Sequence, residues 1–222
     1  MVMDSAEFAR KMIQRAEEYA RLMEEKVYTS REPLSEERVI GLLKSQMYRE
    51  FHLGVMPPSK QLTLIPDTET NLKILITRQL CEEFLHYKVL SDRLEEMGAN
   101  GDLSDYEPLQ EDLDMYRLTY EYQTPWEIAA SLQVFGETIL ITSQRWMIEV
   151  LDPRSAEIMR DEILVHEGSH VRNGRLVLER YATTEEIQRR VEEIGDLKYR
   201  QICKSYGLPM LKTFDMAASG KN

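Results

Sequence analysis

The sequence predicts an all-α protein, a four-helix bundle with additional helices at its N-terminal and C-terminal ends. Apolar residues recur at spacings of three and four along most of the chain, and the alternation typical of strands is almost absent. Only 10 Gly and 8 Pro occur among 222 residues, too few for a loop-rich sandwich or a low-complexity chain. Two Glu-x-x-His pairs, each in the middle of a long helical stretch, favour a bundle built around metal.

The N-terminal half contains recognisable helix boundaries. Ser35 precedes Glu36 as an N-cap, the prolines Pro57 and Pro58 are expected to end the helix that follows, and Gly98 ends the longest helix. The expected helices are 5–28, 36–54, 67–98, 125–151, 155–182 and 184–206.

The C-terminal half begins after a long polar segment, 99–123, which we expect to be a connection. Its length is sufficient to cross from one end of the bundle to the other, which is typical of ferritin-like topology. Pro125 follows Thr124 in a first helical turn, Pro153 marks the end of that helix, and Thr184 is an N-cap for the last one. The last dozen residues are expected to form a loose tail.

One ferritin-like helical domain over 1–222 is the expectation, with a metal-binding bundle at about 36–182 and a C-terminal helix at about 184–206. The net charge of −11 disfavours nucleic acid and anionic membranes as partners. The charged N-terminus is unlike a signal peptide, and no apolar stretch is long enough to span a membrane. Two cysteines, Cys81 and Cys203, cannot form a disulfide framework, so a cytoplasmic location is expected.

The chemistry-bearing pattern is the pair of Glu-x-x-His motifs, Glu83 with His86 and Glu167 with His170. A carboxylate at position i and an imidazole at i+3 point the same way from a helix. Both pairs lie within the apolar stripes of their helices, so they face the core. Burial of such ionisable groups is costly unless something positive compensates them, and a metal centre is the simplest compensation.

The other two long helices each supply one inward carboxylate. Glu50 lies on the row of Leu43 and Met47, and Glu137 is the only charged residue in the stretch IAASLQVFGETILIT. An isolated glutamate in such an apolar run is hard to explain as solvated surface. The predicted metal ligands are therefore Glu50, Glu83, His86, Glu137, Glu167 and His170.

On these residues the chain resembles the ferritin-like di-iron carboxylate proteins, and among them the catalytic subunit of the phenylacetyl-CoA epoxidase group. The similarity covers roughly 47–193 and rests on YREFHLGVMP, on LKILITRQLCEEFLHYKVLSDRLEEMG and on HEGSHVRNG. It implies that Glu50, Glu83, His86, Glu167 and His170 are metal ligands. It also favours an oxygenase or oxidase acting on a small organic or CoA-linked substrate.

Four carboxylates and two imidazoles form a hard oxygen and nitrogen site suited to two Fe ions, or alternatively to a Mn/Fe pair. The expected partners are O2 and a small-molecule substrate, and an electron-donor protein is a further candidate partner. The expected assembly is a homodimer. Glu137 and Glu167 are the expected catalytic residues, and Glu137 is the ligand expected to shift as oxygen binds.

Small residues flank the predicted ligands. Gly54, Gly136, Gly168 and Gly174 either leave room for O2 and substrate or permit close helix packing. In particular, we expect the open side of the metals to lie between Gly136 and Gly168. Gln133, one turn before Glu137, is either a pocket group or a hydrogen-bonded core amide.

Three other interpretations compete with the di-metal oxygenase. The segment from His166 to His170 spells HExxH, the motif of zinc hydrolases, in which both histidines bind zinc and Glu167 is the base. No histidine follows position 170 as a third ligand, and Glu83 and His86 would remain unexplained. A metal-free scaffold subunit and an iron-handling ferritin-like protein or peroxidase are the remaining two.

Overall fold

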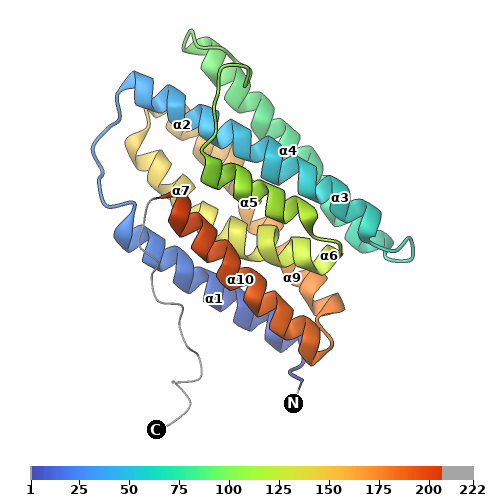
Figure 1. Ribbon diagram of the computed structural model, residues 1–222. Coiled ribbons are helices and arrows are strands. Elements are labelled where there is room, and N and C mark those ends of the chain that lie inside the picture. The colour runs from blue at the N-terminus through green and yellow to red at the C-terminus, as the bar shows by residue number, and fades with distance from the viewer. Residues whose placement is uncertain (1, 207–222) are drawn as a thin grey trace.

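The computed structural model describes residues 2–206 and contains no strand within that range. The all-helical prediction is thus confirmed for this part of the chain. Four long helical rods form the centre, and three further helices pack on them: α1 (Ser5–Lys26), α5 (Gln110–Glu121) and α10 (Glu185–Ser205) (Figure 1).

Three of the four rods are continuous runs that contain a π-helical segment, marked η. The rods are α2 (Glu36–Arg49) with η1 (Glu50–Val55) and α3 (Met56–Leu64); α4 (Thr70–Glu96); α6 (Pro125–Ile128) with η2 (Ala129–Gly136) and α7 (Glu137–Val150); and α8 (Pro153–Ile158) with η3 (Met159–Ile163) and α9 (Leu164–Tyr181). Helix α4 packs along the whole first rod and against α9, while α9 packs against η2 and α7. The rods therefore surround a shared interior.

Of the two predicted N-caps, Thr184 caps its helix, whereas the Ser35 side chain makes no capping hydrogen bond. The Thr124 side chain accepts a hydrogen bond from the backbone N–H of Glu127, and Thr184 does the same for Ile187. Asp152 accepts from the two backbone N–H groups that follow Pro153. At the end of α4, Gly98 adopts a positive φ of 74°, a conformation that glycine tolerates without strain.

The prediction that the second helix ends before Pro57 was wrong. The backbone stays helical through Pro57 and Pro58 to Leu64. The prolines occupy the first turn of α3, directly after η1, where the backbone N–H of Met56 bonds to the carbonyl of Phe51. Proline is tolerated in a first turn because its missing N–H needs no partner there.

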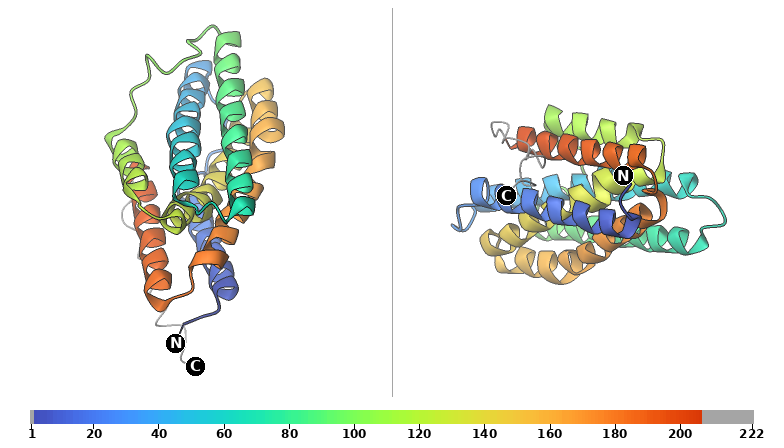
Figure 2. Two further views of the ribbon diagram at one scale, coloured as in Figure 1. Left: turned by 90° about the vertical axis from the view of Figure 1, so that its right-hand side faces the viewer. Right: turned by 90° about the horizontal axis from the view of Figure 1, so that it is seen from below.

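The prediction that 99–123 is only a connection was also wrong, because it contains α5. The acidic composition of this segment obscured a helical row of buried residues, Asp112, Met115, Tyr116 and Thr119. Helix α5 lies beside α10 on one side of the rods (Figure 2). The expected loose tail lies outside the described residues.

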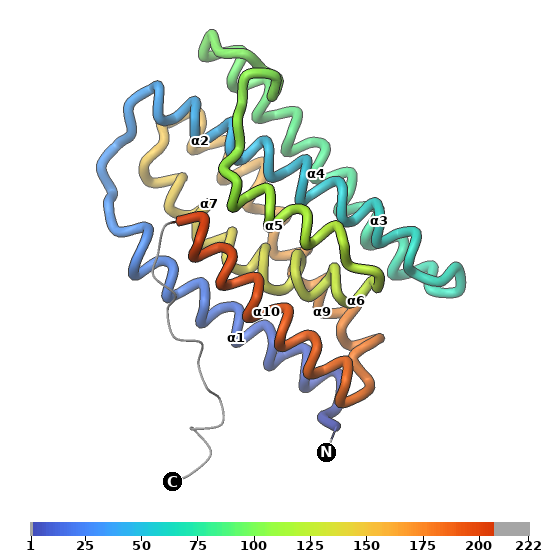
Figure 3. Tube along the Cα trace, in the orientation of Figure 1, coloured from blue at the N-terminus to red at the C-terminus, as the bar shows by residue number. Residues whose placement is uncertain are grey.

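An aromatic core joins the outer helices to the rods. Helices α1 and α10 run side by side (Figure 3), and the rings of Tyr19 and Tyr199 stack between them with centroids 4.0 Å apart. Gly195 of α10 lies directly against the ring of Phe135 in η2, where a Cβ would overlap that ring. This close approach brings the inner face of α10 toward the rod interior. None of the described helices is long and apolar enough to cross a membrane.

Candidate metal site

The six predicted ligand residues lie together inside the rods, and none has more than 4% of its surface exposed. All four rods contribute to this group, which we call the Glu/His cluster. Its members are Glu50 of η1, Glu83 and His86 of α4, Glu137 of α7, and Glu167 and His170 of α9.

Glu83 occupies the centre of the Glu/His cluster. Its Oε2 lies 3.3 Å from Nδ1 of His86, and its Oε1 lies 3.1 Å from Nδ1 of His170. The same two ring nitrogens also approach one further carboxylate each, Glu50 at 3.3 Å and Glu167 at 3.3 Å. Glu83 therefore presents one oxygen to each half of the cluster, as a bridging carboxylate does.

Two subsets of the cluster have the proximity that a metal ion requires. One consists of Glu50, Glu83 and His86, the other of Glu83, Glu137 and His170, and within each the candidate ligand atoms lie within 4.8 Å of one another. Both subsets share Glu83. The arrangement therefore offers two adjacent positions for metal.

The π-helical segments lie next to the ligands. Glu50 is the first residue of η1, Glu137 directly follows η2, and η3 ends one turn before Glu167. A π-helical turn inserts one extra residue and rotates the side chains that follow it, and such turns are frequent at functional sites. We found no signal in the sequence that locates them, because their composition does not differ from that of α-helix.

A second group of side chains orients the ligands. The Nε2 of His170 lies 2.9 Å from Oε2 of Glu82, and the Nε2 of His86 lies 3.0 Å from Nδ1 of His166. Each contact leaves Nδ1 directed into the cluster, as is usual for histidines that ligate metal. Sequence reasoning missed Glu82, since it is one acid among many on an exposed-looking stretch.

Two amides also orient ligand carboxylates. Gln46 donates to Oε1 of Glu50 at 2.5 Å, and Gln144 donates to Oε1 of Glu167 at 2.7 Å. Both glutamines were missed; the one available signal was that Gln46 precedes Glu50 by one helical turn. Gln133 has a different role, because it donates to Gln79 and accepts from Gln61 in a separate amide network. Of its two interpretations, the structure supports the core amide.

Burial disfavours negative charge on two of the carboxylates. It raises the pKa of Glu50 to about 8, although a hydrogen bond with His86 opposes the shift. It raises the pKa of Glu137 well above the ordinary value, and the neighbouring charge of Glu167 raises it further. In the metal-free protein, the neutral form is therefore favoured for both groups.

Paired charges dominate elsewhere in the cluster. Burial would lower the pKa of His86, but hydrogen bonds with Glu50 and Glu83 raise it to about 10. Burial would raise the pKa of Glu83, but the charge of His170 and hydrogen bonds lower it. His170 and Glu167 form a similar pair, with the histidine pKa raised and the carboxylate pKa lowered. The charges of the two histidines therefore offset those of Glu83 and Glu167.

Three buried ligand atoms have no hydrogen-bond partner among residues 2–206: Oε1 of Glu83, Oε2 of Glu167 and Nδ1 of His170. Nδ1 of His170 lies 3.1 Å from Oε1 of Glu83 and 3.3 Å from Oε2 of Glu167, yet the angles do not suit hydrogen bonds. A cation between them would satisfy all three, and their hard oxygen and nitrogen character suits iron or manganese. The residues present therefore fit a metal centre.

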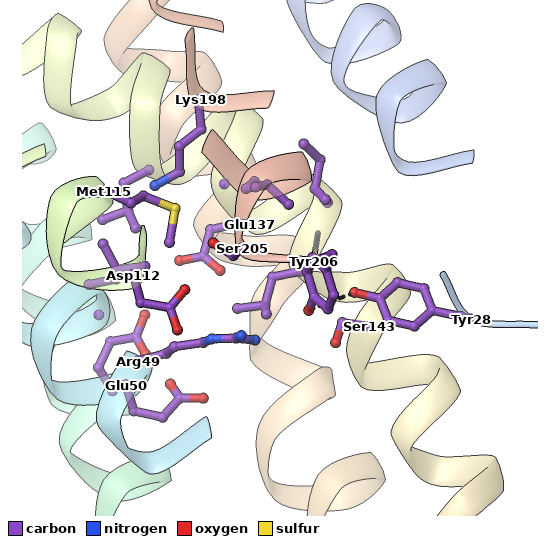
Figure 4. A pocket seen from close by; sticks show the side chains of 18 residues that line it. Tyr28, Arg49, Glu50, Asp112, Met115, Glu137, Ser143, Lys198, Ser205 and Tyr206 are labelled. Atoms are coloured by element: carbon purple, nitrogen blue, oxygen red, sulfur yellow. Dashed lines mark hydrogen bonds between the residues drawn. The ribbon is translucent and has the colours of Figure 1, made fainter. Parts of the chain in front are cut away.

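A cavity of about 50 Å³ borders the cluster on the side of α5 and α10 (Figure 4). Glu50, Glu83 and Glu137 line it, together with Gly54 and Gly136. Other lining residues are apolar or carry charge, among them Leu53, Arg49, Asp112, Met115, Leu132 and Lys198. The room predicted beside the metals therefore exists on this side.

The prediction that the open side of the metals lies between Gly136 and Gly168 was wrong. Gly168 is exposed and borders a surface groove with residues of α1 and α7, because it lies one residue after the inward-facing Glu167 and so points outward. At Gly174 a Cβ would lie 2.6 Å from Cβ of Gln133, so that glycine serves close helix packing.

The structure does not bring His166 and His170 into one ligand group. Neither three-residue group within residues 2–206 contains His166, whose Nδ1 instead faces Nε2 of His86. Comparisons with protein-family models, with curated proteins and with solved structures each found no match. The site is therefore interpreted from its own geometry.

Gly54 provides a direct test of the cluster, because a Cβ at this position would overlap the Glu83 carboxylate. We expect Gly54→Ala to displace Glu83 and to lower the metal content per chain measured by elemental analysis. Gly168→Ala is the matched control, since nothing lies within 4 Å of its Cβ position. Equal metal content in the two variants would contradict the central role of Glu83.

The metal-free protein is expected to lose stability as the pH rises from 6.5 to 8. In this range the unfolded chain has released protons that folded Glu50 and His86 retain, so the folded state binds more protons and its free energy of unfolding falls with pH. Chemical denaturation should show a fall of more than about 1 kcal/mol, given about 1.4 kcal/mol per pKa unit.

Glu50→Gln tests the origin of that dependence, because glutamine has no titrating proton. The variant should lose less stability over the same pH range than the wild type. Glu162→Gln, at an exposed position, is the control and should behave as the wild type does. A stability that rises with pH, or identical slopes in all three proteins, would refute the assignment of the protons to the cluster.

Proposed function

We propose that this chain is a ferritin-like, non-haem di-metal oxidoreductase, an O2-dependent oxygenase or oxidase of a small organic substrate. The observation that carries the proposal is the buried pair of Glu/His motifs around Glu83, beside a cavity. Bound there as two reduced iron ions, or as a Mn/Fe pair, the metals would supply O2 activation for oxidation of an organic molecule.

The protein's own residues prepare the site for that chemistry. Glu82 and His166 fix the orientation of the two histidine rings, so each Nδ1 is available as a ligand atom. Gln46 and Gln144 each donate to one carboxylate oxygen of their partner glutamate, and the other oxygen faces Nδ1 of a ligand histidine. The ligand set is therefore held in place before metal arrives.

Of the two expected catalytic carboxylates, Glu137 is favoured for contact with substrate. It borders the cavity, whereas Glu167 is not among the lining residues and is held by Gln144. Apolar neighbours of Glu137 in the cavity, such as Ile139 and Leu132, exclude water from its surroundings. We therefore assign Glu137 to the reacting side and Glu167 to ligation.

The runner-up function is iron handling, as in a ferritin-like protein or a peroxidase. The cavity favours the oxygenase, because its lining next to the ligands is largely apolar and suits a hydrocarbon group. Insertion of one oxygen atom into a substrate also consumes two electrons, so the proposal includes an electron donor as a partner. We further propose a cytoplasmic setting and a homodimer.

The proposal is tested by loading the protein with Fe(II) without oxygen and then adding O2. We expect about two irons per chain, stoichiometric O2 uptake, and an oxidised product when small organic molecules are supplied. His86→Ala and His170→Ala should each lose iron and O2 uptake, since each removes one ligand from a subset. His52→Gln is the control, because His52 stacks on Tyr48 outside the cluster.

Three results would contradict the proposal. Accumulation of many irons per chain as mineral would indicate iron storage. One zinc per chain that depends on His166 would indicate a hydrolase. A protein that binds no transition metal under any loading condition would indicate a scaffold.

A further inference from the structure

Lys198 of α10 is a buried cation that lacks a hydrogen-bond partner. Only 2% of its surface is exposed, and its Nζ has no hydrogen-bond partner among residues 2–206. The side chain extends into the cavity beside the Glu/His cluster (Figure 4). Burying an unpaired ammonium group is costly, so a group that the cavity receives must compensate it.

Arg49 contributes a second cation to the same cavity. It lies immediately before Glu50. Its guanidinium interacts with the hydroxyl groups of Tyr116 and Tyr206, while its Nε has no hydrogen-bond partner within the described part of the chain. Burial lowers the pKa of Lys198 to about 8; the charge of Glu137 opposes this shift and the charge of Arg49 adds to it.

Asp112 of α5 is the one other carboxylate lining the cavity besides those of the Glu/His cluster. It is buried, and its Oδ1 has no hydrogen-bond partner among the described residues. One carboxylate cannot balance two cations, and the Lys198 ammonium makes no hydrogen bond to any carboxylate among the described residues. Two divalent ions, if bound, would neutralise the four carboxylates of the Glu/His cluster. Outside the cluster, the lining therefore has one positive charge in excess.

The uncharged residues of the lining indicate which kind of molecule fits the cavity. Leu53, Met115, Leu132, Ile139, Leu140 and Ile202 provide apolar wall. The hydroxyl groups of Tyr28 and Tyr206 lie at one end and are hydrogen-bonded to each other at 2.9 Å (Figure 4). A volume of about 50 Å³ favours a short molecule over a CoA thioester.

We propose that the cavity binds a short-chain organic acid as its carboxylate, held by the Lys198 ammonium and the Arg49 guanidinium, with its hydrocarbon part against the apolar wall. Arginine and lysine are the usual partners of a buried carboxylate, and arginine can bind both of its oxygens. This inference names the substrate class of the proposed oxygenase and rests on it for the reaction, while binding itself needs no metal.

The test measures binding of butyrate, butyramide and inorganic phosphate to the full chain by calorimetry, both metal-free and loaded with iron. Butyramide has nearly the shape of butyrate but no charge. We expect butyrate to bind at least about tenfold more tightly than butyramide, because it compensates the excess positive charge. Phosphate should bind more weakly than butyrate, since it gains nothing from the apolar wall.

Lys198→Met keeps the length of the side chain and removes its charge. It should weaken butyrate binding at least about tenfold and leave butyramide binding unchanged. Lys204→Met is the matched control on the same helix, because Lys204 is exposed, and it should bind butyrate as the wild type does. Arg49→Gln is the second variant and should also weaken butyrate binding, which keeps the test valid if Lys198→Met fails to fold.

Equal binding of butyrate and butyramide, or unchanged butyrate binding in both Lys198→Met and Arg49→Gln, would overturn the inference. So would tighter binding of phosphate than of butyrate, or no binding of butyrate at all. Iron content is measured on the same samples. If the protein binds butyrate selectively but takes up no iron on loading, this inference is supported and the proposed function is overturned. If it takes up two irons per chain but does not bind butyrate selectively, the proposed function stands and this inference is overturned.

Discussion

Burial of four carboxylates and two imidazoles inside a helical bundle is the constraint on which the rest of this structure depends. Such a group is stable only if its charges balance, and Glu83 achieves this by lying between the two histidines. Each rod contributes at least one member, so the electrostatic balance ties the four rods together. The orienting contacts of Glu82, His166 and the two glutamines follow from the same requirement, because a buried ligand with free rotation would lose its partner.

The outer helices have a role in the site as well as in stability. Helix α10 brings Lys198 and helix α5 brings Asp112 to the cavity that borders the cluster. The stacked rings of Tyr19 and Tyr199, and the close contact of Gly195 with Phe135, hold α10 in the position that this requires. The cavity is therefore formed between the rods and the outer layer. The groove at Gly168, by contrast, lies at the surface between residues of α1 and α7.

Much of this arrangement was predictable from the sequence. Helical periodicity located the rods. The two Glu-x-x-His pairs and the isolated Glu137 located the cluster, since an acid in an apolar helical row is hard to explain as solvated surface. The π-helical segments were not predictable, because they change the backbone register without changing composition. Helix α5 was missed because acidic residues surround its buried row, and the position of the cavity was missed with it. Glu82 was missed because the sequence does not show in which direction each of several adjacent glutamates points.

The proposed di-metal centre would hold one metal ion on either side of Glu83. Diffraction from crystals of the iron-loaded protein, with data collected on both sides of the iron absorption edge, locates such ions. We expect two anomalous peaks, one among Glu50, Glu83 and His86 and one among Glu83, Glu137 and His170. A single peak that includes His166, or no peak within the Glu/His cluster, would contradict the proposal.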